Sequence, residues 1–324
     1  MTGWSGKTVL VTGHGGFLGS WLSRALCRRS ARVLGLSHRG HAPRAGDGEV
    51  EVIAADICDK AAIAPVFARY SIDVLFHLAA QTLPTMARQD PCLAFEVNAM
   101  GAWNVLEAAR NAARVPQIVI SSTDSVYGEN DGSPFTEDCV LAPMFPYEAS
   151  KACAEMVARC YHKTYRLPVA IARFCNLYGP EDVAASRLMA GAIDAALRGE
   201  RQKLRGDGSA VRNYLYVEDA VAALLALAEA LERPDIAGEA FNFCEETPLS
   251  VLDVVGRVLA LAGRPDLAPH LGSGTPGEIS IKRASAGKAR RVLGWRPTVG
   301  LDEGLARTIA WHRARGVAHP EAVA

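Results

Sequence analysis

One glycine-rich stretch decides the fold of this chain: Thr12-Gly13-His14-Gly15-Gly16-Phe17-Leu18-Gly19. It directly follows an apolar run at residues 8–12 and opens an amphipathic pattern at residues 17–30. Gly13 permits a tight turn, Gly16 lets the backbone approach a pyrophosphate, and Gly19 lets a helix and a strand pack closely. The N–H groups at the start of the helix then face the phosphates. Because the glycines stand between a strand and a helix, their spacing predicts a dinucleotide-binding turn.

Apolar runs alternate with amphipathic stretches through the first half of the chain. Short apolar runs separated by longer amphipathic segments are typical of parallel strands that are buried on both faces. We therefore predict an α/β fold with a doubly wound parallel sheet, and right-handed crossovers place helices on both of its faces. The expected strands are residues 8–12, 32–36, 50–54, 73–77, 117–122 and 168–174, and the expected helices are residues 17–30, 59–70, 93–113 and 148–165.

The pattern changes after residue 178. Helical segments are expected at residues 185–198, 218–231, 250–262 and 301–315, among Gly- and Pro-rich connections. Short strands are expected near Gln202 and Phe241. We predict a dinucleotide-binding domain at residues 1–178 and a smaller, mixed α/β domain at residues 179–324.

Composition excludes several classes of function. The 324 residues hold 35 basic and 35 acidic side chains, so no net field is available to hold a polyanion, and nucleic acid is not an expected partner. No apolar stretch is long enough to span a bilayer and no apolar leader begins the chain, so we expect a cytoplasmic protein without a membrane partner. The eight cysteines form no CxxC pair and no residue cluster has metal-ligand spacing; we expect no metal, and reduced, mostly buried thiols.

The end of the second expected strand bears on the choice of cofactor. A carboxylate at this point hydrogen-bonds the adenosine ribose and repels a 2′-phosphate. The sequence has Ser37, His38 and Arg39 instead, and a hydroxyl with a guanidinium suits a 2′-phosphate, which favours NADP over NAD. Arg39 is also compatible with a solvated position in an NAD enzyme. Asp56 and Ile57 follow the third strand and are placed to meet the adenine, although Asp56 also suits a helix cap.

A tyrosine and a lysine four residues apart predict a catalytic centre. Tyr147 and Lys151 lie on one face of an expected helix. A phenol titrates near pH 10, but a nearby ammonium and a nicotinium ring favour its anion, so Tyr147 can act as a general base. Thr123 ends the fifth strand at the edge where open α/β sheets bind ligands, and it is the natural donor to the oxygen that Tyr147 deprotonates.

Six further segments complete a pattern with the glycine-rich turn. They are HLAAQ at residues 77–81, Asn98, SST at residues 121–123, YEASK at residues 147–151, RFCNLYGP at residues 173–180 and RNYLYVED at residues 212–219. From about residue 8 to residue 297 the chain resembles an extended short-chain dehydrogenase/reductase of the nucleotide-sugar epimerase and dehydratase group.

The resemblance implies a Rossmann domain that later segments near residues 214–245 extend, and a C-terminal domain that holds a nucleoside-diphosphate sugar. It implies Thr123, Tyr147 and Lys151 as the catalytic trio, with NAD or NADP as cofactor. It also implies a homodimer formed through the helices at residues 93–113 and 148–165. The expected cofactor contacts are Gly13, Gly16, Phe17, Leu18, Gly19, Ser37, His38, Arg39, Asp56, Ile57, Leu78, Ala79, Ala80, Gln81, Asn98, Ser121, Tyr147, Lys151, Phe174 and Asn176. The expected substrate contacts are Thr82, Thr123, Asn176, Leu188, Arg212 and Glu278.

The residues beside Thr123 bear on the reaction. In this group Tyr147 would take the sugar 4-hydroxyl proton while hydride leaves C4. The 4,6-dehydratases then use an acid and a base, usually Asp-Glu and in some relatives Asp-Lys, where this chain has Asp124-Ser125. A serine cannot be that base without a partner, which the sequence does not show. A 4-epimerase needs neither group and usually has small residues here.

We therefore rank 4-epimerase above 4,6-dehydratase, with Asp124 as the catalytic residue that keeps dehydration open. The run at residues 13–22 favours dehydration too, because it most resembles the CDP-glucose 4,6-dehydratases. An NADP-dependent 4-ketosugar reductase is a further alternative, supported by Ser37, His38 and Arg39. A non-catalytic dinucleotide sensor is disfavoured, since it has no need of Tyr147 and Lys151.

Overall fold

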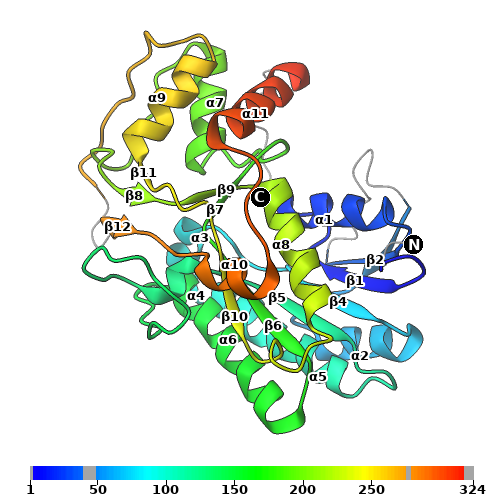
Figure 1. Ribbon diagram of the computed structural model, residues 1–324. Coiled ribbons are helices and arrows are strands. Elements are labelled where there is room, and N and C mark those ends of the chain that lie inside the picture. Colours follow the sequence, from blue (N-terminus) through cyan, green and yellow to red (C-terminus); the bar gives the residue numbers. More distant parts are fainter. Residues whose placement is uncertain (1–2, 39–48, 275–278, 317–324) are drawn as a thin grey trace.

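The computed structural model describes residues 3–38, 49–274 and 279–316. A sheet of seven parallel strands lies at its centre, in the order β10-β6-β5-β4-β1-β2-β3 (Figure 1). The strand order reverses between β1 and β4, so the predicted doubly wound, Rossmann-like fold is confirmed. The strands are β1 (Thr8–Thr12), β2 (Arg32–Ser37), β3 (Val50–Ala54), β4 (Val74–His77), β5 (Gln117–Thr123), β6 (Val169–Phe174) and β10 (Ala240–Phe243).

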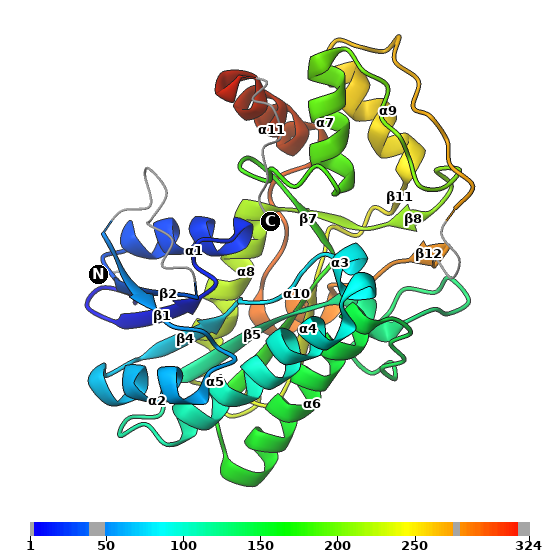
Figure 2. The same cartoon turned by 180° about the vertical axis from the view of Figure 1, so that it is seen from behind.

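Helices cover both faces of this sheet (Figure 2). One face carries α1 (Phe17–Cys27) and α8 (Val217–Ala230), and the other carries α2 (Lys60–Arg69), α5 (Gly101–Arg110) and α6 (Pro146–Tyr165). Since alternate residues of a strand face opposite sides, Val9 and Val11 pack with α1 whereas Leu10 packs with α2 and α5. None of the helices in the described ranges combines the length and the apolar character needed to cross a membrane.

The single helix expected at residues 93–113 is interrupted. The structure has α3 (Pro84–Gln89) and α4 (Pro91–Phe95), then a π-helical segment, η1 (Glu96–Met100), before α5. Asn98 explains the interruption, because its side chain accepts a hydrogen bond from the Gln81 N–H at 2.7 Å and donates to the Ser150 hydroxyl at 2.9 Å. Such π-helical turns accommodate one extra residue and frequently mark functional sites.

The C-terminal half forms a smaller, mixed unit, as predicted. Three helices share one apolar cluster: α7 (Leu188–Arg198), α9 (Val251–Leu261) and α11 (Leu301–Arg315). The small sheets are β7 (Asn176–Tyr178) with β9 (Tyr214–Tyr216), and β11 (Leu249–Ser250), β8 (Val211–Arg212) and β12 (Ile281–Lys282). The strand expected near Gln202 is wrong: a single bridge between Lys203 and His270 stands there, in a stretch of bends rich in glycine.

The chain returns to the large sheet after this crossing. α8 packs beside α1, and β10 adds to the sheet edge in register, with Ala240 opposite Ile171. α10 (Gly287–Leu293) then packs against β10. The division of the chain at residue 178 stays a prediction.

The eight cysteines are unpaired, but the expectation that most of them are buried is wrong. Cys175 and Cys244 are buried, whereas Cys92, Cys153 and Cys160 are exposed and the other three are intermediate. The exposed three lie on α4 and α6, and none of them is among the buried residues of those helices.

Candidate active site

A cavity of about 1900 Å³ opens at the carboxyl ends of the central strands. Its wall includes a residue at or just after the end of each of six strands, from Gly13 after β1 to Phe174 at the end of β6. This is the edge where open α/β sheets bind their ligands. The cavity continues to Lys203, Arg212 and Tyr214 in the C-terminal half, so both halves of the fold contribute to one site.

Most of the residues predicted for the site line this cavity. They are Gly13, Gly16, Phe17, Leu18, Gly19, Ser37, His38, Asp56, Ile57, Leu78, Ala79, Ala80, Thr82, Ser121, Thr123, Asp124, Tyr147, Phe174, Asn176, Leu188 and Arg212.

Three predicted residues are not among the described residues that line the cavity. Asn98 and Lys151 are buried, with 1% and 5% of their surface exposed. Gln81 donates its backbone N–H to the side chain of Asn98. Two others, Arg39 and Glu278, lie outside the described residues. The contacts assigned to all five stay predictions.

The glycine-rich turn has the shape that a pyrophosphate requires. Gly13 has a φ of +71°, and a Cβ built on it would lie 2.8 Å from the Ala79 nitrogen. A Cβ on Gly19 would overlap the carbonyl oxygen of Gly13. Gly16 caps α1 without a side chain, which leaves the N–H groups of the first turn available to phosphate oxygens. The turn therefore fits a dinucleotide.

Asp56 does not cap the helix that follows it, which was the alternative interpretation of this residue. The side chain of Asp59, not Asp56, caps α2 by accepting from the Ala61 N–H at 2.8 Å. Asp56 accepts from the Cys58 N–H at 2.9 Å and lines the cavity. Asp56 therefore lies in the cavity wall and does not cap the helix, and its contact with a cofactor stays a prediction.

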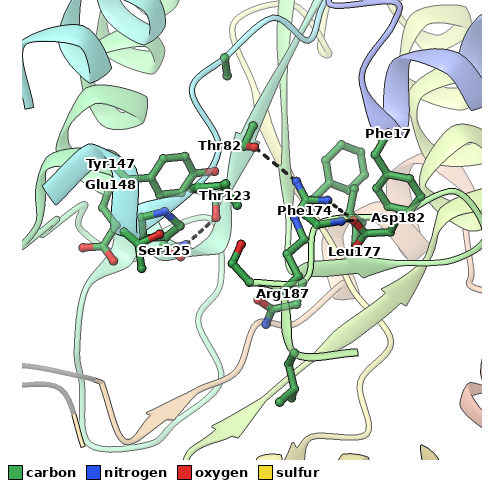
Figure 3. A pocket seen from close by; sticks show the side chains of 18 of the residues that line it. Phe17, Thr82, Thr123, Ser125, Tyr147, Glu148, Phe174, Leu177, Asp182 and Arg187 are labelled. Carbon is green, nitrogen blue, oxygen red and sulfur yellow. Dashed lines mark hydrogen bonds and ion pairs between the residues drawn. The ribbon is translucent and has the colours of Figure 1, made fainter. Parts of the chain in front are cut away.

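Tyr147 and Thr123 lie next to each other in the wall of the cavity (Figure 3). Tyr147 stands in the first turn of α6, directly after Pro146, whose fixed φ suits the first helical position. Burial, together with the nearby Asp124 carboxylate, raises the pKa of Tyr147 to about 12, while its hydrogen bond with the Thr123 hydroxyl acts in the opposite direction. Burial lowers the pKa of Lys151, one helical turn away, to about 8.

Lys282 is the site residue that the sequence did not reveal. It lies on β12, and its Nζ is 2.9 Å from Asp124 Oδ1 and 2.5 Å from Ser125 Oγ. No motif surrounds it, and 157 residues separate it from Ser125. Only the folded chain brings Lys282 to the site, because β12 pairs with β8, where Lys282 stands opposite Arg212, a residue predicted for the site.

Arg187 was also missed, and it lines the same cavity. Its guanidinium donates to Asp182 Oδ1 at 3.0 Å and to the Thr82 hydroxyl at 3.3 Å (Figure 3). Arg212 lines the cavity as well, but its guanidinium donates to the Val211 and Ile279 carbonyls. The substrate contact expected of Arg212 stays a prediction.

A model of the NAD dependent epimerase/dehydratase family matches residues 9–244. A dTDP-glucose 4,6-dehydratase of Neisseria gonorrhoeae is 32% identical, over 94% of this chain and 95% of that protein. A UDP-glucose 4-epimerase of Mycolicibacterium smegmatis is 33% identical, over 94% of this chain and 98% of that protein.

A solved structure extends the similarity over the whole fold. The UDP-glucose 4-epimerase of Thermotoga maritima, with UDP-glucose, matches with a TM-score of 0.87 and 28% identity, covering 95% of this chain and 99% of that one. The expected family is therefore confirmed, and this chain belongs to the NAD-dependent epimerase/dehydratase family of enzymes.

Proposed function

We propose that this enzyme is a nucleoside-diphosphate-sugar 4-epimerase that acts through a transient 4-keto sugar. Relatives with epimerase and dehydratase activity are about equally similar, so the groups beside the reacting carbons carry the proposal. The observation that carries the proposal is that Ser125, and not a glutamate or a lysine, follows Asp124, and that its hydroxyl is engaged by Lys282.

The chemistry at C4 needs one base and one hydrogen-bond donor. A dinucleotide held by the glycine-rich turn, Ser37 and Asp56 supplies a hydride acceptor when it is bound. Tyr147 takes the proton of the sugar 4-hydroxyl, and Thr123 holds that oxygen in place. The family resemblance assigns Lys151, one turn along α6, to the same catalytic trio, and an ammonium near a phenol favours the phenolate form.

Dehydration would need a proton donor and a second base next to these residues. Asp124 is ion-paired with Lys282, so its Oδ1 atom is already engaged by an ammonium of this chain. Ser125 accepts a hydrogen bond from the same ammonium, so its oxygen is not available as a base. The 4-keto sugar therefore rotates within the cavity, and hydride returns to the other face of C4.

A 4,6-dehydratase is the second candidate, because one observation favours it. The Oδ2 atom of Asp124 is buried and has no hydrogen-bond partner among the described residues. Such an oxygen suits a substrate hydroxyl. The reductase alternative and the preference for NADP over NAD stay predictions, since Arg39 lies outside the described residues.

Product mass distinguishes these reactions. The enzyme is incubated with UDP-, dTDP-, CDP- and GDP-glucose, and the products are analysed by mass spectrometry and chromatography. An isomer of unchanged mass supports the epimerase, whereas loss of about 18 mass units, one water, indicates the dehydratase. Stoichiometric consumption of reduced cofactor would identify the reductase.

A homodimer is part of the proposal, supported by an apolar hollow on α5 and α6. Trp103 and Met156, 54% and 59% exposed, line it with Val157, Cys160 and Tyr161. Large exposed apolar side chains gathered on one face mark interaction sites. Light scattering should give twice the chain mass, and Met156→Glu should reduce it to the mass of one chain.

A further inference from the structure

Arg187 is a cation of the cavity wall that lies outside the motifs of the sequence. It is the N-cap residue of α7, and it lines the cavity together with Phe17 and Thr82. Its side chain is 31% exposed, whereas its ion-pair partner Asp182 is 6% exposed. A ligand in the cavity can therefore reach the guanidinium, while the carboxylate beneath it is covered.

Two side chains hold this guanidinium in place. Nη1 donates to Asp182 Oδ1 at 3.0 Å, and Nη2 donates to the Thr82 hydroxyl at 3.3 Å (Figure 3). Burial raises the pKa of Asp182, and the charge of Arg187 is the first influence that opposes this rise. Because a guanidinium has five N–H donors in a rigid fork, two contacts fix its orientation without using all of its donors.

The glycine-rich turn lies beside the same guanidinium. The Arg187 Cζ atom is 5.8 Å from the centre of the Phe17 ring, and Phe17 is the first residue of α1. The N–H groups at the start of that helix are the ones that face a pyrophosphate. A phosphate bound there would lie next to Arg187, and a guanidinium can pair with two phosphate oxygens at once.

The contact with Thr82 crosses from one half of the fold to the other. Thr82 follows β4 of the central sheet, whereas Asp182 and Arg187 precede α7 in the C-terminal half. The Thr82 contact is the longer of the two, and a neutral hydroxyl is a weaker partner for a guanidinium than a phosphate oxygen is. A phosphate can therefore replace Thr82 while Asp182 continues to hold Arg187.

Arg212 is the arginine that the sequence assigned to the substrate, but its contacts are of another kind. Its guanidinium donates to the backbone carbonyls of Val211, Ser280 and Ile279. The hydrogen bonds of Arg187 are instead with side chains of the cavity wall. Arg187 is thus the better placed of the two to exchange a contact for a ligand.

We infer that Arg187 binds a diphosphate in the cavity, and that Asp182 positions its guanidinium for this contact. Two ligands carry such a group: the dinucleotide, and the nucleoside-diphosphate sugar of the proposed function. The inference rests on the proposed function for the second ligand only. It is the same for an epimerase and for a dehydratase, because both would act on a nucleoside-diphosphate sugar.

Calorimetry of the wild type and Arg187→Gln tests the inference in two arms. One arm titrates NAD into the enzyme, and the other titrates UDP, dTDP, CDP and GDP into the enzyme saturated with NAD. Arg187→Gln should weaken the binding of NAD, of the nucleoside diphosphates or of both by about 10- to 100-fold, the range of a hydrogen bond to a charged group. The arm that shows the loss identifies the diphosphate that Arg187 binds.

Arg198→Gln is the matched control. Arg198 lies in the last turn of α7, its side chain is 33% exposed, and it is ion-paired with Glu200 at 3.1 Å. It is not among the described residues that line the cavity. The variant removes the same charge from the same helix, so both affinities should stay at the wild-type value.

Arg187→Lys separates the charge from the geometry of the fork. Lysine keeps the positive charge but presents a single nitrogen, so this variant should retain part of the affinity that Arg187→Gln loses. Wild-type affinity of Arg187→Gln in both arms would overturn the inference, as would an equal loss in Arg198→Gln. If thermal unfolding shows that Arg187→Gln does not fold, Arg187→Lys takes its place, with an expected loss of about tenfold. Loss of folding in both would show that Arg187 is only structural.

Failure of the proposed function gives a different result. If the wild type binds NAD but none of the four nucleoside diphosphates, the proposed class of substrate is wrong, and the NAD arm still decides the role of Arg187. If the wild type and Arg187→Gln bind both kinds of ligand equally well, only the role of Arg187 is wrong.

Discussion

The guanidinium of Arg173 and the carboxylate of Glu155 form an ion pair with no solvent exposure, with 2.6 Å between Nη2 and Oε2. Arg173 lies on β6 and Glu155 on α6, so the pair fastens the helix that carries Tyr147 to the sheet. The Ser122 hydroxyl donates to the same carboxylate at 2.5 Å. The position of the catalytic helix therefore depends on a charge pair in the core.

Breaking this pair should destabilise the protein strongly. Glu155→Ala leaves a guanidinium buried without its counter-ion, and the expected loss in free energy of unfolding is about 3–5 kcal/mol, measured by urea denaturation. Glu51→Ala is the control, because it removes the exposed partner of Arg32, whose ion pair has a similar distance of 2.7 Å. Surface pairs contribute little, so equal losses in both variants would contradict the argument.

Tyr147→Phe should reduce turnover at least about 100-fold, since it removes the base that takes the 4-hydroxyl proton. NAD binding, measured by calorimetry, should be largely retained, because the glycine-rich turn is untouched. Turnover close to that of the wild type would remove Tyr147 from the mechanism. Tyr165→Phe, on the exposed end of the same helix, should leave turnover unchanged.

The pH dependence of turnover should shift when the charges around Tyr147 change. The pKa of Tyr147 is about 12. The charges of Asp124 and Glu148 raise this pKa, and the charge of Arg187 lowers it. Asp124→Asn should therefore lower the pKa, and because the phenolate is the active form, the acid limb of kcat/KM should move to lower pH. Arg187→Gln should move it to higher pH. Shifts in the same direction for both variants would refute this electrostatic account.

Gly13→Ala should weaken NAD binding and lower the melting temperature. The new Cβ would press on the Ala79 backbone at 2.8 Å, and φ at Gly13 is +71°. Gly256→Ala is the matched control: it lies within α9, where a Cβ meets nothing within 4 Å. Alanine there should stabilise the protein by about 0.5–1 kcal/mol. A melting temperature that falls equally in both variants would contradict the steric argument.

Short apolar runs in the sequence identified the strands of the central sheet. The six strands expected in the first half exist with shifts of one residue or less at their ends. β4 and β6, for example, are buried at every residue and mostly apolar. The interruption at Asn98 could not be predicted, since it depends on hydrogen bonds to Gln81 and Ser150 that exist only in the folded chain. The short β8, β11 and β12 were missed because two residues carry no periodic pattern.

The sequence by itself determined the family, the glycine-rich turn and the placing of Thr123 and Tyr147 in one cavity. These features follow from residues that are close together in the chain, or from strand ends that a parallel sheet brings to one edge. Only the tertiary structure revealed Lys282. Its contact with Asp124 and Ser125 joins segments far apart in the chain, and the position of such a side chain is fixed by the pairing of β12 with β8 rather than by any local pattern.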